Sequence, residues 1–147
     1  MANILVIVEQ REGKFNRVSL ETLTGAQQIA AQTGWSIEVA VLGSGVGSIA
    51  NDVAKNKVAK VYAVESPALA KYTPDAFAHA LKQFIEQRKP ELVLMPHTYQ
   101  VRDFAPQLTT ALGRTLISDC VGFRKDGDKL IFTRGAFEQV EARLTTE

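Results

Sequence analysis

The polar residues best suited to binding a ligand stand together, directly after a short apolar run. His97 and Thr98 follow the run at 92–95, and Arg102 and Asp103 lie about one helical turn further on. The pattern predicts a strand, a loop and a helix start, and in open α/β sheets ligands bind outside the carboxyl ends of strands. The backbone N–H groups of a helix start favour anions, and an arginine can pair with phosphate or carboxylate through two hydrogen bonds.

Three interpretations of this segment remain open. In the first, Thr98 or Gln100 caps the helix, Asp103 lies in its first turn where the helix dipole favours a negative charge, and Arg102 stays solvated. In the second, these side chains contact another domain or a partner protein. In the third, they contact a nucleotide together with Gln10, which follows the first predicted strand and would reach the same edge of the sheet.

Residues suited to metal or nucleophilic chemistry are few. The chain has two histidines, His79 and His97, and one cysteine, Cys120. We expect His79 to be a surface or half-buried helical residue, and no metal site of ordinary ligand spacing is visible. Cys120 is expected to be a small buried apolar residue, since a nucleophilic cysteine needs an activating base and the sequence suggests none. The sequence therefore predicts neither a catalytic residue nor a metal ligand.

Asp119 is an acid inside a predicted apolar strand, where a carboxylate is costly to bury unless it is paired. Arg134, at the end of the next predicted strand, is a candidate partner. We expect a structural ion pair or a contact at a domain boundary in preference to catalysis, because structural ion pairs also place charged groups in such positions.

A glycine-rich run at 43–47 invites comparison with the dinucleotide motif G-x-G-x-x-G. That motif opens the helix of a βαβ unit, whereas this run has the spacing G-x-G-x-G and follows the second predicted strand. The run is predicted to form a tight strand-to-helix turn, because glycine adopts backbone angles that other residues avoid.

Predicted strands and helices alternate along the first three quarters of the chain. Apolar runs predict strands at 4–8, 37–42, 60–64 and 92–95, with a polar loop at 10–14. Ser19 is expected to cap a helix with apolar positions at Leu20, Leu23, Ala26 and Ala30. Further helices are predicted at about 48–56, from Thr73 and an N-terminal Pro74 to Lys89-Pro90, and at about 103–112.

The pattern changes after Gly113. Strands are predicted at 116–123 and 129–133 around an Asp126-Gly127 turn, and the chain beyond Arg134 is expected to be irregular. Together these elements predict an α/β fold. It consists of a mostly parallel, doubly wound sheet with helices on both faces and a C-terminal antiparallel hairpin.

Composition limits the class of protein. The 147 residues suit one domain, 1–147, and 46% hydrophobic with 22% charged residues is ordinary for a globular chain. A net charge of +1 gives no electrostatic basis for binding nucleic acid. No apolar run reaches the ~18 residues of a membrane span, and the N-terminus has no basic region of a signal peptide. We therefore expect a cytoplasmic domain without membrane insertion.

Several blocks of the chain resemble one known family. The most specific is Arg102-Asp103-Phe104-Ala105-Pro106, and the others are Asn3 to Glu9, Lys57 to Tyr62, Pro90 to Leu94, Ala111-Leu112-Gly113, Leu116-Ile117-Ser118-Asp119 and Phe132-Thr133-Arg134. In this order and spacing they resemble the N-terminal domain of the electron transfer flavoprotein alpha subunit.

The resemblance implies a function for the whole assembly. In that family the alpha subunit pairs with a beta subunit, and the heterodimer carries one FAD. It passes electrons from acyl-CoA and related dehydrogenases to a quinone oxidoreductase or another acceptor. The FAD is held mainly by the alpha subunit's C-terminal domain. The resemblance therefore implies that this chain is an assembly scaffold, truncated before its last strands and the FAD domain, with no cofactor of its own.

A second interpretation belongs to a different class. The fold is also similar to the adenine nucleotide alpha hydrolase and universal stress protein group. A stand-alone module of that type would bind AMP or ATP at the ends of the first and fourth strands, near residues 8–10 and 97–103. A third interpretation, an enzyme acting through Cys120, lacks companion residues for that cysteine.

Overall fold

A computed structural model gives the arrangement of the chain. It describes residues 3–11, 14–15, 17–43, 58, 60–69, 71–96, 98–113, 120–126, 129–134 and 139–143. The predicted helix at 48–56, the glycines at 45 and 47, and two candidate site residues, His97 and Asp119, lie outside these ranges.

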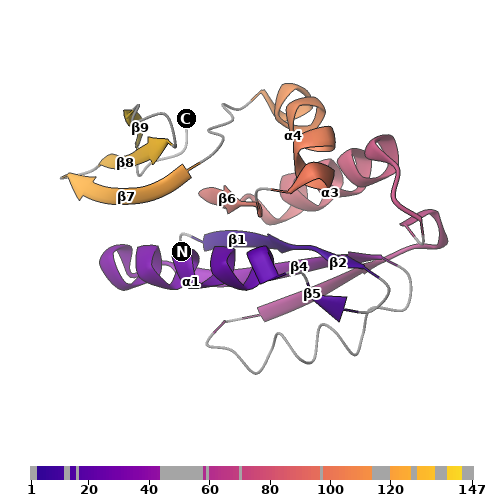
Figure 1. The fold of residues 1–147 in the computed structure, drawn as a ribbon, viewed down its shortest axis with the longest axis horizontal. Helices are drawn as coiled ribbons and strands as arrows, with labels where there is room; N and C mark the ends of the chain where they lie inside the picture. Colours follow the sequence, from indigo (N-terminus) through magenta and orange to yellow (C-terminus); the bar gives the residue numbers. More distant parts are fainter. Residues whose placement is uncertain are drawn as a thin grey trace.

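Four parallel strands form the main sheet. They are β1 (Asn3–Val8), β4 (Ser36–Gly43), β5 (Lys60–Glu65) and β6 (Leu92–Leu94), in the spatial order β5-β4-β1-β6 (Figure 1). In the register of the sheet, Val6 lies between Val39 and Leu94. From β1 the chain therefore builds outward through β4 and β5, and then returns to place β6 on the other side of β1.

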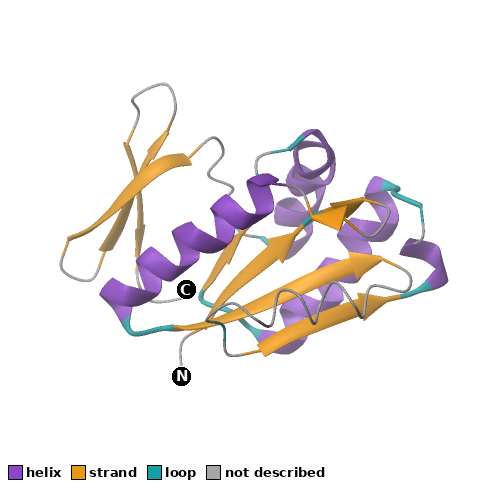
Figure 2. Cartoon of the chain, turned by 60° about the horizontal axis from the view of Figure 1, so that its bottom comes forward, coloured by secondary structure: helices purple, strands orange, loops and turns teal. Residues whose placement is uncertain are grey.

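Helices cover both faces of this sheet, as predicted (Figures 1 and 2). Helix α1 (Arg17–Thr33) packs on one face, while α3 (Pro74–Arg88) and α4 (Tyr99–Leu112) pack on the other. Successive side chains of β1 point to opposite faces, so Val6 joins the α1 core and Leu5 joins the α3 and α4 core. Because β1 is buried on both faces, its sequence is apolar at every position from Ile4 to Val8.

The ends of α3 follow the signals in its sequence. Thr73 is the N-cap, its Oγ1 accepts the N–H of Ala76 at 3.3 Å, and Pro74 is the first helical residue. Lys89 ends the helix in the left-handed conformation at φ 48°, and its N–H donates to the carbonyl of Ile85 at 2.8 Å. The predicted start and stop of this helix are confirmed.

Three local predictions are wrong. Helix α1 begins at Arg17, so Ser19 lies inside the helix and does not cap it. Leu20 is 45% exposed, because it lies to the side of the buried stripe that Leu23, Ala26 and Ile29 form. The polar segment predicted as a loop contains a short antiparallel pair, β2 (Gln10–Arg11) with β3 (Lys14–Phe15).

The end of the described chain forms a separate antiparallel sheet. Its strands are β7 (Cys120–Asp126), β8 (Lys129–Arg134) and β9 (Gln139–Arg143), and the predicted hairpin is its first half (Figure 1). The expectation of irregular chain beyond Arg134 is wrong for β9, whose sequence QVEAR alternates polar and apolar residues as a half-buried strand does. Within the described part, no helix is long and apolar enough to cross a membrane.

Candidate functional site

The candidate site lies where the chain reverses its direction across the sheet. The strands on either side of this point are β1 and β6, whose carboxyl ends are followed by Gln10 and Thr98. In open α/β sheets, ligands bind in the crevice at such a topological switch point. The structure therefore places two of the predicted residues, Gln10 and Thr98, after the strands on either side of this point, and it adds Glu9, which was not predicted from the sequence.

Glu9 is the residue with the most connections at this crevice. It is 8% exposed, its backbone N–H donates to Ser19 Oγ at 2.7 Å, and the Ser19 hydroxyl lies 3.4 Å from its carbonyl oxygen. Its Oε1 accepts the Thr98 hydroxyl at 2.8 Å. A buried carboxylate directly after an apolar strand must find partners, and that position was the signal available in the sequence.

Thr98 has two roles through one hydroxyl. It is the N-cap of α4, where its Oγ1 accepts the N–H of Val101 at 3.2 Å, and it donates to Glu9. Capping by Thr98 was one of the predicted alternatives, and it is confirmed. The helix begins at Tyr99, four residues before the predicted start at 103.

Asp103 consequently lies beyond the first turn of α4, and its expected interaction with the helix start is wrong. Its Oδ2 accepts the hydroxyl of Tyr72 at 2.7 Å, and the same hydroxyl lies 3.2 Å from the carbonyl oxygen of Gln100. Burial, then the hydrogen bond and charge of Asp103 and the more distant charge of Glu9, raise the pKa of Tyr72 well above its usual value. Asp103 therefore fastens the segment before α3 to α4.

The two remaining described candidates also have assigned positions. The Gln10 side-chain amide donates to the carbonyl of Leu42 at 3.2 Å, which ties β2 to the end of β4. Arg102 is exposed as expected, and its guanidinium carbon lies 5.8 Å from the ring centroid of Tyr99, within the range of a cation–π contact. Tyr99 is itself 88% exposed.

A small pocket lies at the switch point. Its volume is about 10 Å³, and its walls include Glu9, Gln10, Gln100, Leu42, Phe77 and Phe104. Ligand pockets commonly measure about 300–1,000 Å³, whereas about 10–15 Å³ holds one water molecule. In the arrangement that the structure describes, this crevice is large enough for about one water and not for a nucleotide.

The other predicted residues do not join this site in the described part of the chain. Arg134 lies in β8 opposite Cys120 of β7, and its pairing with Asp119 stays a prediction because Asp119 is outside the described ranges. His79 is exposed on α3, as expected. Among the described residues there is no cluster of three or more potential metal ligands.

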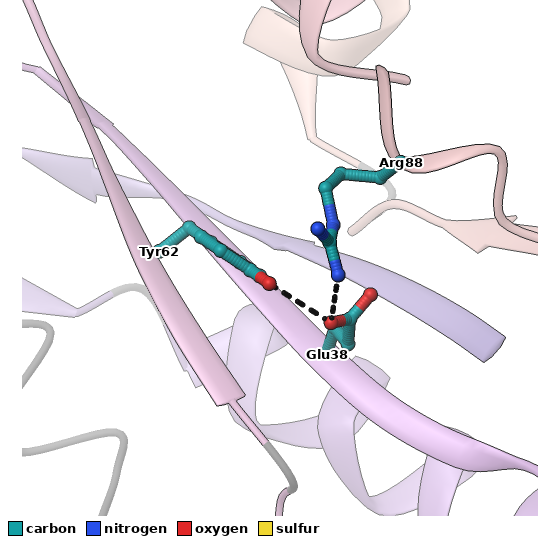
Figure 3. Close-up of polar contacts among 3 residues, drawn as sticks. All are labelled: Glu38, Tyr62 and Arg88. Carbon is teal, nitrogen blue, oxygen red and sulfur yellow. Dashed lines mark hydrogen bonds and ion pairs between the residues drawn. The ribbon is translucent and has the colours of Figure 1, made fainter. Parts of the chain in front are cut away.

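A second polar cluster, also missed from the sequence, lies near the amino ends of the strands (Figure 3). The side chain of Glu38 is 6% exposed, and its Oε2 accepts the Tyr62 hydroxyl at 3.1 Å and Arg88 Nη2 at 2.9 Å. The Arg88 guanidinium lies 5.0 Å from the centre of the Tyr62 ring. Burial, and then the hydrogen bond and charge of Glu38, raise the pKa of Tyr62.

This second cluster lies away from the switch-point crevice and connects elements of the fold. Glu38 stands opposite Leu5 and Lys60 in the sheet, about 16 Å from Gly43 at about 3.3 Å per strand residue. It therefore lies at the far end of the sheet from the switch-point crevice. Its partners come from β5 and from the last residue of α3, so the cluster joins three elements.

Comparison with known proteins gives a consistent match along the chain. The sequence model of the family described as "Electron transfer flavoprotein domain" matches residues 4–146. The "Electron transfer flavoprotein subunit alpha" of Thermoanaerobacterium thermosaccharolyticum is 32% identical over 136 residues, which are 92% of this chain and 41% of that protein. The subunit of the same name from Syntrophomonas wolfei is 34% identical over 137 residues, 93% of this chain and 42% of that protein.

A third relative bears a different name. The "Acryloyl-CoA reductase electron transfer subunit beta" of Anaerotignum propionicum is 31% identical over 129 residues, 88% of this chain and 35% of that protein. The chain thus spans about two fifths of the length of the curated relatives it matches, or less. All three relatives are named as electron transfer subunits.

Proposed function

The chain belongs to the electron transfer flavoprotein domain family, and from that membership we propose that it is part of an electron transfer flavoprotein. Such a protein is a heterodimeric carrier with one FAD. In this proposal residues 1–147 are one domain of the alpha type, and the domain acts as a scaffold on which the two subunits assemble. The assembled protein would carry electrons for other enzymes, and this domain would supply no catalytic residue.

The size of the switch-point crevice is the observation that supports a scaffold most directly. A nucleotide module of the universal stress protein type needs an open crevice at this edge of the sheet, near Gln10 and Thr98. The pocket that described residues line there has a volume of about 10 Å³, and Glu9, which helps to line it, is bonded to Thr98. A scaffold needs no such opening, so this geometry favours assembly over nucleotide binding.

The cofactor and partners follow from the proposed assembly. FAD would belong to the complete alpha/beta protein, and we assign none of its contacts to this chain. The partner in the heterodimer would be a beta subunit, and the electron donors would be acyl-CoA and related dehydrogenases, with a quinone oxidoreductase as one acceptor. The name of the Anaerotignum propionicum relative, which joins electron transfer to a CoA-ester reductase, supports donors or acceptors of that class. A single cysteine suits a reducing compartment, and we place the assembly in the cytoplasm.

A native mass spectrum of the protein purified from its source cells tests the proposal. We expect this chain in a species that also contains a second subunit and one FAD, and acid release of FAD should give its absorption spectrum. A chain that carries AMP or ATP and no second subunit would refute the scaffold and favour the stand-alone module. Titration of the isolated chain with AMP or ATP is the control, and the scaffold predicts no saturable binding.

A further inference from the structure

Glu9 connects three elements at the mouth of the switch-point crevice. It directly follows β1, its backbone is bonded to Ser19 of α1 on one face of the sheet, and its carboxylate is bonded to Thr98 at the start of α4 on the other face. Because α1 and α4 cover opposite faces, these two contacts cross the sheet at its carboxyl edge. Glu9 thus lies between the two helices where a ligand would have to enter.

The carboxylate of Glu9 lies beside the start of α4 and accepts the hydroxyl of its N-cap, Thr98. The start of an α-helix attracts negative charge through its free N–H groups and its dipole. Here the carboxylate of Glu9, a residue that is 8% exposed, accepts the hydroxyl that caps α4, and that hydroxyl in turn accepts the N–H of Val101. A buried carboxylate is costly without hydrogen bonds, so these contacts are what keep Glu9 inside.

We infer that Glu9 is a built-in occupant of the switch-point crevice, and that its contact with Thr98 closes the crevice against anionic ligands. The negative charge that a ligand's phosphate would bring to the start of α4 is supplied by the chain itself. The remaining space of about 10 Å³ is what the walls and this carboxylate leave unfilled. This inference concerns one edge of the sheet, and it holds whether or not the chain assembles with a second subunit.

Amide hydrogen exchange on the purified protein, in the complex in which it is isolated, tests this closure. The reporters are the N–H groups of Val101 and Arg102, which donate to the Thr98 hydroxyl and carbonyl. In Glu9→Ala we expect both to exchange about tenfold faster or more, because a partly buried hydrogen bond to a charged group is lost. Glu9→Gln keeps an acceptor oxygen and should change exchange less. Glu86→Ala removes an exposed carboxylate of α3 and is the matched control.

Addition of inorganic phosphate tests whether Glu9 occupies a position that an anion could take or only links two elements. Glu9→Ala vacates space near the start of α4, so phosphate should slow exchange of Val101 in that variant and leave the wild-type protein and Glu86→Ala unchanged. Unchanged exchange in Glu9→Ala would overturn the inference. An equal response to phosphate in the wild-type protein would overturn it too, as would faster exchange that phosphate does not reverse.

A second variant separates closure from loss of the fold. The amides of Leu81 and Ile85 in α3 report global unfolding, because both side chains are buried in the core on that face. If they also exchange quickly in Glu9→Ala, Glu9→Asp is used instead. Its shorter carboxylate cannot reach Thr98, so Val101 should exchange several-fold faster, while the retained charge should prevent any response to phosphate. Wild-type exchange of Val101 in this variant would refute the closure, and none of these outcomes depends on the native mass spectrum.

Discussion

The contact between Glu38 and Arg88 allows a quantitative test of how the sheet is held to α3. In Arg88→Met the long side chain remains, but the charge and its donors are lost, and Glu38 is left buried with the Tyr62 hydroxyl. A hydrogen bond between charged groups contributes about 1.5–3 kcal/mol, and the cation–π contact with Tyr62 adds about 0.5–1 kcal/mol.

Two features of Arg88 determine how much Arg88→Met should lower the free energy of unfolding. Its side chain is 36% exposed, so water already screens part of the interaction. Its Nε is buried and has no hydrogen-bond partner within the described part of the chain, so the wild-type pair is itself imperfect. Leaving one charge of a fully buried pair uncompensated costs about 3–5 kcal/mol, and we expect Arg88→Met to lose less, about 2–3 kcal/mol.

Urea unfolding followed by circular dichroism measures this loss. Lys82→Met is the matched control on the same helix, because Lys82 pairs with Glu86 at an exposed site and should contribute less than about 0.5 kcal/mol. The double variant Glu38→Leu/Arg88→Met removes both charges, and it should be more stable than the sum of the two single variants implies by at least about 1 kcal/mol. The reasoning is refuted if Arg88→Met behaves like the control, or if the two changes are additive.

Three other predictions follow from the described contacts. Thr98→Val removes both the cap of α4 and the bond to Glu9, and it should lower the free energy of unfolding by about 2 kcal/mol in urea. Thr98→Ser keeps the hydroxyl and should lower it little, so equal losses in the two variants would contradict this role of Thr98. Leu81→Ala opens the core and should cost about 2–5 kcal/mol, against less than about 0.5 kcal/mol for the exposed Leu20→Ala, as thermal unfolding would measure. Folding raises the pKa of Tyr72 above its ordinary 10.0, so the contribution of this tyrosine to stability is complete below pH 10.0 and is lost as the pH rises further. The urea concentration at the midpoint of unfolding should therefore fall more steeply at alkaline pH in the wild-type protein than in Tyr72→Phe.

The alternation of elements was predictable because it depends on local patterns. The apolar run of β1 is continuous, and the cap and N-terminal proline of α3 are adjacent residues, so each local pattern predicted the correct element. The start of α4 was missed even though Val101, Phe104, Ala105 and Leu108 form a helical stripe, since the polar residues before Val101 suggested a loop.

The polar contacts could not be predicted because their partners are far apart in the sequence. Glu9 and Thr98 are 89 positions apart, and Glu38 and Arg88 are 50 apart. Local patterns can show that a buried acid needs a partner, but only the strand order brings a particular hydroxyl or guanidinium to it. The same limit applies to Asp103, whose partner Tyr72 lies before a different helix.

Buried carboxylates at both ends of the sheet have a common physical consequence. Glu9 joins β1 to α1 and α4 at the carboxyl edge, and Glu38 joins β4 to β5 and α3 near the amino edge. Buried ionic groups add little net stability, and where they are retained they can specify one arrangement of elements over others. In a scaffold whose two faces must hold fixed positions, that specificity is more useful than a larger apolar core. If Glu38 and Arg88 specify the arrangement in this way, the double variant Glu38→Leu/Arg88→Met should show faster amide exchange across β4 and β5 than its stability in urea accounts for.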